Sequence, residues 1–352
     1  MKNSKFIKFS AVILCVTTVL SACFSFVLIR VNKCFSLGSD TAAIAAFMSY
    51  SNGSLFKKSQ ALAENKTEKK SRSETPQPTL NIEKTDNDKK TSSSNTYPVV
   101  ETNISSGNMS YENIAVKNTT DYSLDIESVL KKDLPFEVSD SRQVQVLIVH
   151  THTCESYMES DSGEYSEDFY PRTTDNDKNV CAVGEELANG LKARGIGVVH
   201  DTTRHDYPTY DGAYDRSYET IEKYLEKYKD IKVIIDLHRD SMTAQNNTKY
   251  KPIFEYNGKK AAQIMIMTGH SEDSDFSFWD ENLILALKLQ KKCEDMYPGM
   301  TRPLNFGDFT YNMNANNGSL LIEFGTDANT VEEAKRSGAM LANALAAVLQ
   351  KD

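Results

Sequence analysis

Val144-Gln145-Val146-Leu147-Ile148-Val149-His150-Thr151-His152-Thr153-Cys154-Glu155-Ser156-Tyr157 changes abruptly from an apolar run to a polar cluster. The β-branched, apolar residues 144–149 predict a buried strand. Two histidines and a carboxylate follow directly, and the packing of a hydrophobic core does not require such polar residues. In an open α/β sheet, ligands bind in the crevice beyond the carboxyl ends of the strands. The stretch therefore predicts a functional site at the end of a buried strand.

Strand-like and helix-like patterns alternate from residue 142 onward. Further strands are expected at 196–200, 232–238, 264–267 and 319–325. Helices are expected around 180–191, 214–228, 282–297 and 330–350, the last of them opened by a capping box at Thr330 and Glu333. Alternating strands and helices favour an α/β fold, a three-layer αβα sandwich with a mostly parallel sheet. We assign this domain to residues 140–352.

The amino-terminal part of the chain carries a different pattern. Residues 1–8 contain three lysines and precede an apolar run at 9–29, which is long enough to span a bilayer. We predict a short cytoplasmic N-terminus followed by an uncleaved transmembrane anchor. Residues 20–23 imitate a lipoprotein cleavage box, so lipidation at Cys23 is the alternative; the apolar run continues beyond it. Residues 30–139, rich in Ser, Thr, Asn, Lys and Glu, predict a flexible linker, with a short element within 124–136.

Composition excludes several functions. The formal net charge of -9 argues against nucleic-acid binding. The cysteines are scattered and none has CxxC spacing, which argues against a zinc knuckle and against a thioredoxin-like site.

A second histidine ends another apolar strand. His238 closes the run at 232–238, and Asp236 lies two residues earlier on the same side, where it can orient the imidazole. Two histidines and one carboxylate form the ligand set of hydrolytic zinc sites. We predict His152, Glu155 and His238 as ligands of Zn2+, with His150 as the alternative to His152. Glu185 and Glu186, on the helix at 180–191, offer another carboxylate.

Glu323 lies near the end of the last predicted strand, in a run that is otherwise apolar. A carboxylate that leaves water there is costly unless it faces a polar cleft or an ion, and such a group suits general-base catalysis. The alternative is a buried ion pair with Arg239 or another base. Cys154 is not expected to act as a nucleophile because no third group orients it. His205 is expected to line the cleft, whereas His200 and His270 are expected to be surface or core residues.

Residues 146–157, 236–241 and 321–325 together resemble stage II sporulation protein P of endospore-forming bacteria, in the same order and within residues 142–350. The resemblance implies a zinc-dependent N-acetylmuramoyl-L-alanine amidase, with crosslink endopeptidase activity, that remodels peptidoglycan during engulfment. It implies sporulation proteins D and M as partners and an extracytoplasmic location between the mother-cell and forespore membranes. The family pattern marks the six residues His150, His152, Glu155, His238, Arg239 and Glu323 here.

On this hypothesis Glu323 accepts the proton of the attacking water, and Arg239 binds a stem-peptide carboxylate or stabilises the oxyanion. Two alternatives remain. One is a metallopeptidase that cuts only the stem peptide, and the other is a catalytically inactive wall-binding scaffold.

Overall fold

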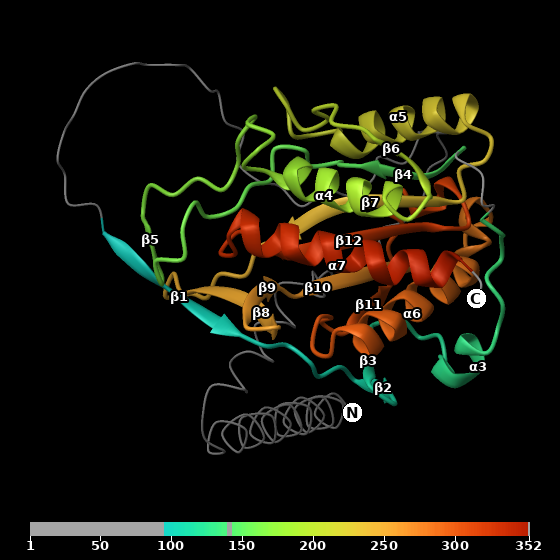
Figure 1. Cartoon of the computed structure of the whole chain (residues 1–352), viewed down its shortest axis with the longest axis horizontal. Coiled ribbons are helices and arrows are strands. Elements are labelled where there is room, and N and C mark those ends of the chain that lie inside the picture. Colours follow the sequence, from blue (N-terminus) through green and yellow to red (C-terminus); the bar gives the residue numbers. More distant parts are fainter. Residues whose placement is uncertain (1–94, 139–142, 351–352) are drawn as a thin grey trace, which may run out of the picture. The chain divides into compact units, whose positions relative to one another are not determined.

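A mixed sheet of eight strands forms the centre of the part of the chain that the computed structural model describes, residues 95–138 and 143–350 (Figure 1). From one edge to the other, its strands are β2 (Met109–Tyr111), β3 (Ile114–Asn118), β11 (Leu304–Gly307), β10 (Ile264–Gly269), β12 (Ser319–Thr326), β7 (Val233–Asp240), β4 (Val144–Val149) and β6 (Gly197–His200). The α/β class predicted from the sequence is confirmed.

The sheet is mixed but mostly parallel, as predicted, because five of its seven neighbouring strand pairs are parallel. β6, β4, β7 and β12 run parallel to one another, but β10 is antiparallel to β12. β11 and β3 follow the direction of β10. The sheet therefore consists of two opposed parallel blocks, with β2 antiparallel to β3 at one edge. The carboxyl ends of β4, β7 and β12 meet at one edge, and this edge brings the predicted site residues together.

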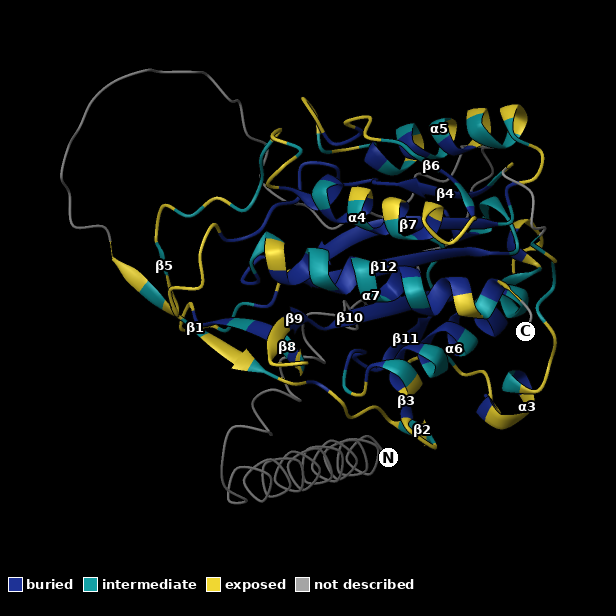
Figure 2. Ribbon diagram, in the orientation of Figure 1, coloured by how far each residue is buried: buried dark blue, intermediate teal, exposed yellow. Residues whose placement is uncertain are grey.

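Helices cover both faces of the sheet. α4 (Val180–Lys192), α6 (Trp279–Met296) and α7 (Val331–Leu349) lie on one face, and α5 (Ala213–Lys227) lies on the other (Figure 1). Alternation along β4 explains both contacts, because neighbouring side chains of a strand point to opposite faces. Ile148 belongs to the core beneath α4 and α7, whereas Leu147 packs with Ile221 of α5. Figure 2 shows the central strands buried between these layers.

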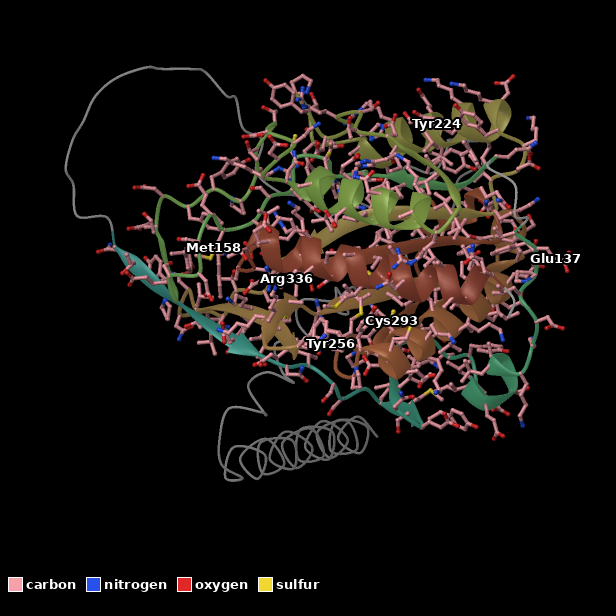
Figure 3. All side chains as sticks on the ribbon, viewed as in Figure 1. Glu137, Met158, Tyr224, Tyr256, Cys293 and Arg336 are labelled. Atoms are coloured by element: carbon pink, nitrogen blue, oxygen red, sulfur yellow. The ribbon has the colours of Figure 1, made fainter. Side chains whose placement is uncertain are left out.

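Local signals fix the ends of two of these helices. Thr330 and Glu333 form the predicted capping box at the start of α7. Gly195 follows α4 with a φ of 81°, a left-handed conformation that glycine adopts without a steric penalty. Cys293, labelled on α6 in Figure 3, is a free buried cysteine, as are Cys154 and Cys181.

Residues 95–138 correct the prediction of a flexible linker over 30–139. β1 (Thr96–Thr102) joins a second sheet in the order β5 (Glu164–Ser166), β1, β8 (Lys249–Tyr256) and β9 (Lys259–Ala262). Ile114 and Val116 of β3 are buried in the main core, and α3 (Ile126–Leu130) lies within the short element expected at 124–136. β1 is largely exposed (Figure 2). Its order comes from backbone pairing with distant strands, which composition does not reveal.

The predictions for the amino-terminal residues 1–8 and 9–29, for Cys23 and for the linker up to residue 94 lie outside the described residues. Within the described residues, no helix combines the length and the apolar character needed to cross a membrane.

Candidate functional site: a His, Glu and Asp cluster at the ends of β4, β7 and β12

Three strands place their polar residues next to one another. Glu323 of β12 pairs directly with His238 of β7, and Asp236 of β7 pairs with Val149, the last residue of β4. The turn that follows Val149 carries His152 and Glu155 over the end of β7. The alternation of side chains puts Asp236, His238 and Glu323 on the face covered by α5. The apolar strands and the acids or histidines at their ends thus build one site.

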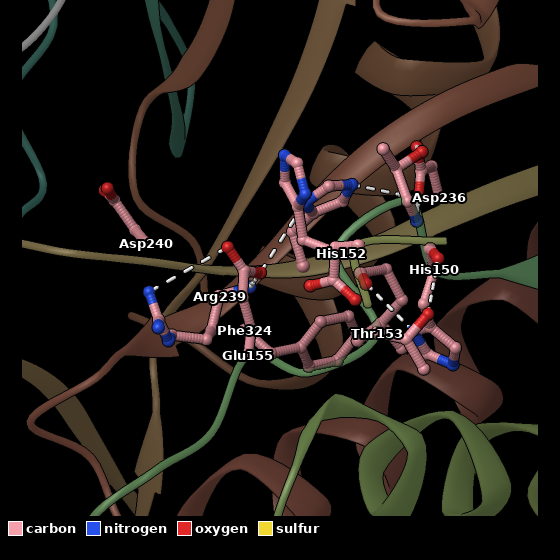
Figure 4. Close-up of polar contacts among 12 residues, drawn as sticks. His150, His152, Thr153, Glu155, Asp236, Arg239, Asp240 and Phe324 are labelled. Atoms are coloured by element: carbon pink, nitrogen blue, oxygen red, sulfur yellow. Dashed lines mark hydrogen bonds and ion pairs between the residues drawn. The ribbon is translucent and has the colours of Figure 1, made fainter. Parts of the chain in front are cut away.

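His238 lies between two carboxylates. Its Nε2 is 2.9 Å from Oδ1 of Asp236, and its Nδ1 is 3.6 Å from Oε2 of Glu155 (Figure 4). Asp236 is itself held by Thr151, which donates from its backbone nitrogen over 2.8 Å and from its hydroxyl over 2.6 Å. Burial alone would lower the pKa of His238, but the two carboxylates raise it well above its ordinary value. The site therefore attracts positive charge.

His152 approaches His238 from the other side. The two rings are nearly perpendicular, with centroids 5.2 Å apart. Tyr210 stacks on His152 and its hydroxyl lies 3.1 Å from Nε2, while Nδ1 is buried and has no hydrogen-bond partner. Burial lowers the pKa of His152 to about 3, so the ring is neutral at physiological pH. A neutral imidazole with an unpaired buried nitrogen has the form that binds metal ions.

Arg239 orients Glu155. Its backbone nitrogen donates to Oε2 of Glu155 over 3.1 Å, and its Nη1 lies 3.9 Å from Oε1. Its Nε and Nη2 donate to the carbonyls of Ser156 and Pro171. Burial would raise the pKa of Glu155, but Arg239 and His238 hold it well below its ordinary range. The guanidinium of Arg239 thus holds the segment 155–171 in place, and its predicted role toward the substrate stays a prediction.

Glu323 is a partly buried acid with an incomplete set of partners. Its Oε2 is buried without a hydrogen-bond partner, and burial together with Asp240 raises its pKa to about 8. No ion pair with Arg239 forms, since the contacts of Arg239 are with Glu155, Ser156 and Pro171. The structure thus places Glu323 beside His238 as a proton-holding group.

His150 lies apart from this cluster. Its Nδ1 contacts the carbonyl of Leu237 at 2.9 Å, and its Nε2 is 2.8 Å from Nε2 of His200. A Cβ atom added at Gly184 of α4 would lie 2.8 Å from His150, so this imidazole packs against α4, away from α5. His200 in turn pairs with Glu185 at 3.2 Å.

Two further predicted residues support the turn instead of facing a cleft. His205 contacts the carbonyl of His150 through Nδ1 and the hydroxyl of Thr220 through Nε2. Its predicted place along the cleft is therefore corrected. Burial and Asp206 raise the pKa of Cys154 to about 12, so its thiol stays protonated and is a poor nucleophile.

Tyr214 and Tyr311 complete the wall of the site and were not expected from the sequence. Tyr214 packs edge-on against His152 and stacks on both His238 and Tyr311. The only available signal was the recurrence of Tyr210 and Tyr214 at the start of a helix.

The donor set fits a divalent metal ion. His152, Glu155 and His238 supply two imidazoles and one carboxylate, and Nδ1 of His152 has no other partner. Three acids elsewhere in the fold lie closer together than the donors of the histidine cluster. Ligand atoms of Glu101, Asp161 and Glu333 lie within 4.8 Å of one another. The ammonium of Lys251 contacts all three of these acids at 2.7 to 3.1 Å and takes the place of an ion.

Comparisons with known proteins agree with the family resemblance. Residues 36–346 match the family model of Stage II sporulation protein P (SpoIIP). Stage II sporulation protein P of Bacillus subtilis (strain 168) is 30% identical over 232 residues, which cover 63% of this chain and 54% of the relative. The chain thus matches about half the length of that relative.

Solved structures give weaker similarity. N-acetylmuramoyl-L-alanine amidase AmiC2 of Nostoc punctiforme matches with a TM-score of 0.36 and 12% identity, over 60% of this chain and 97% of that chain. The CwlD amidase of Clostridioides difficile, solved in complex with the GerS lipoprotein, matches with a TM-score of 0.34 and 14% identity, over 58% and 96%. Similarity at this level does not establish a shared function.

Proposed function

We propose that this chain, which belongs to the stage II sporulation protein P family, is a zinc-dependent N-acetylmuramoyl-L-alanine amidase. It would cleave the amide between muramic acid and L-alanine in peptidoglycan, and also peptide crosslinks, during engulfment in sporulation. The observation that carries the proposal is the convergence of His152, Glu155, His238 and Glu323 at one sheet edge, with buried and unpaired atoms on His152 and Glu323.

His152, Glu155 and His238 would hold the zinc ion. When bound, the ion would supply Lewis-acid chemistry to the amide and to the attacking water. Asp236 fixes the ring of His238, and Arg239 fixes the carboxylate of Glu155. Such outer partners orient ligands and usually matter for affinity. The chain therefore supplies both the ligands and the groups that hold them.

Glu323 is the proposed general base. It is adjacent to His238 and keeps one carboxylate oxygen free of hydrogen bonds. Positive charge bound nearby favours the ionised carboxylate and lowers the pKa of Glu323 toward the working range of a base. Glu323 would take the proton of the attacking water and deliver it to the leaving amine.

Product analysis tests the proposal. The zinc-loaded full chain is incubated with purified sacculi. An amidase releases peptides with a new amino-terminal L-alanine and leaves peptide-free glycan. A metallopeptidase that cuts only the stem peptide leaves peptides on muramic acid, and an inactive wall-binding scaffold releases neither product. Either of these results would overturn the amidase proposal.

Location and partners belong to the same proposal. The family resemblance supports a single-pass membrane protein with an extracytoplasmic catalytic domain, acting with sporulation proteins D and M. Fractionation of sporulating cells and co-purification with each of the two proteins test these statements separately from catalysis.

A further inference from the structure

Hydrolysis of an amide develops negative charge on the carbonyl oxygen, and a fixed hydrogen-bond donor beside that oxygen speeds the reaction. Arg239 is one predicted donor, although its side chain also contacts Glu155, Ser156 and Pro171. Tyr311, in the loop between β11 and β12, carries another donor at this site.

The backbone of this loop is strained at Tyr311. Its φ is 39°, and the φ of the next residue, Asn312, is 61°. Asparagine tolerates this left-handed conformation, but a bulky side chain adopts it rarely. Strained conformations of this kind occur mostly at functional sites, where neighbouring contacts enforce them. The conformation of Tyr311 therefore points to a function for its side chain.

Buried polar contacts enforce the strained conformation. Asn312 is buried, and its Nδ2 donates to the carbonyl of Tyr214 over 3.0 Å and to the hydroxyl of Ser217 over 2.8 Å, both on α5. Asn282 of α6, which is also buried, donates to the carbonyl of Met313 over 2.8 Å. Both helices therefore fix the backbone directly after the strained tyrosine.

The ring of Tyr311 lies beside the histidine cluster. It stacks on Tyr214, with centroids 5.4 Å apart, and Tyr214 in turn stacks on His238 at 6.4 Å. Phe309 also packs against the ring, with centroids 5.0 Å apart. Burial and the charge of Glu323 raise the pKa of Tyr311, while His238 lowers it. The phenol is thus within electrostatic reach of a proposed ligand and of the proposed base.

The hydroxyl of Tyr311 has no hydrogen-bond partner among residues 95–138 and 143–350, and its oxygen is not fully enclosed. The hydroxyls of two nearby tyrosines are engaged, since Tyr157 donates to the carbonyl of Phe324 and Tyr210 contacts His152. A phenol is protonated at neutral pH and can therefore donate. Tyr311 thus offers a fixed and unused donor.

We propose that Tyr311 is a catalytic residue, whose hydroxyl donates a hydrogen bond to the carbonyl oxygen of the scissile amide as negative charge develops there. The inference rests on the proposed function and adds a role to the same site. A donor aimed at developing charge stabilises the transition state more than the bound substrate. The strained loop would hold this donor in place before the substrate arrives.

Tyr311→Phe tests the proposal, because it removes the hydroxyl and keeps the stacked ring. The zinc-loaded full chain is assayed with a synthetic N-acetylmuramoyl-L-alanyl peptide. Tyr311→Phe should lower kcat about 100-fold, the usual size for one such donor, and change KM by less than about threefold.

Tyr256→Phe is the matched control and should behave like the parent. Tyr256 ends β8 (Figure 3), is half-buried and packs edge-on against Tyr297. Its hydroxyl also has no hydrogen-bond partner in the described part of the chain. The two variants therefore make the same chemical change at different places.

A phosphinate analogue of the substrate gives a measurement that does not depend on turnover. Its tetrahedral, negatively charged phosphorus group stands in for the developing charge. Titration calorimetry should show that Tyr311→Phe weakens binding of the analogue by about the same factor as kcat. Zinc affinity, measured by chelator competition, should equal that of the parent.

The two hypotheses fail in different ways. A zinc-loaded parent that does not hydrolyse the amide would overturn the amidase proposal and the role of Tyr311 with it. If the parent is active and Tyr311→Phe keeps its kcat, or loses kcat without weaker binding of the phosphinate, only the inference is wrong. Loss of zinc affinity or of folding, checked by circular dichroism, would show that the hydroxyl has a structural role and would also overturn the inference.

Discussion

Glu323→Gln should stabilise the metal-free protein while it abolishes turnover. Oε2 of Glu323 is buried, and burial with Asp240 raises the pKa of the carboxyl from 4.5 to about 8. The unfolded chain releases this proton near the ordinary pKa, whereas the folded chain keeps it. Between pH 4.5 and 8 the folded state therefore binds more protons, and its stability falls as pH rises through this window.

The size of the effect follows from the same numbers. Each pH unit above the ordinary value of 4.5 costs about 1.4 kcal/mol of stability until the pH reaches the raised pKa. The cost is about 3 kcal/mol at pH 7. Glutamine cannot ionise, so the chelated Glu323→Gln protein should be more stable than the chelated parent by up to this amount. The difference should shrink toward pH 5.

Urea denaturation of chelated full-length protein at pH 5, 7 and 8 measures this difference. Glu333→Gln is the matched control, because Glu333 is also buried but accepts hydrogen bonds from Lys251, Asn329 and Thr330. That variant should be less stable by about 1 to 3 kcal/mol. With zinc restored, Glu323→Gln should turn over at least about 100-fold more slowly than the parent. A Glu323→Gln protein that is less stable than the parent at pH 8 would refute the reasoning.

Three further predictions concern the metal, its supports and the thiols. His152→Ala should lose bound zinc while His150→Ala keeps it, as measured by metal content of purified folded protein; the reverse result would exchange their roles. Asp236→Asn should weaken zinc binding about 10- to 100-fold in a chelator competition, since it removes the carboxylate that orients His238. Cys154 should resist alkylation in native protein at pH 8 and react after unfolding, because burial and Asp206 raise its pKa to about 12; rapid native labelling would show that the turn opens.

The convergence of His152, Glu155, His238 and Glu323 could be predicted because two simple rules coincide. Apolar strands can be recognised from their composition, and neighbouring parallel strands have their carboxyl ends at the same edge of the sheet. His238 and Glu323 lie on such strands, and the structure pairs them directly. The alternation of side chains along a strand could not show whether His150 or His152 belongs to the site. β4 ends at Val149, so the strand alternation no longer applies to the turn that follows.

Residues 95–138 escaped prediction for a different reason. Their strands have only three to seven residues, and β1 has no buried residue. β1 is ordered by pairing with β8, some 150 residues later in the chain, as Val99 with Lys249. Side-chain patterns report burial, but backbone hydrogen bonds to a distant strand leave almost no trace in them.

Repulsion among three neighbouring acids explains the contacts of the site. Glu155, Asp236 and Glu323 gather three acids around His238, and in the metal-free state protons on His238 and Glu323 offset the repulsion. Arg239 supplies the fixed part of the positive charge from outside the cluster, and it touches only Glu155 among the three acids. The remaining positive charge must come from protons or cations that can exchange with solvent. A site that holds protons so far above their ordinary pKa values is one that a dication can enter by displacing them, which couples metal affinity to pH. If Glu323 is the base that the proposed function assigns, the stability lost through it is the physical consequence of keeping that base unpaired.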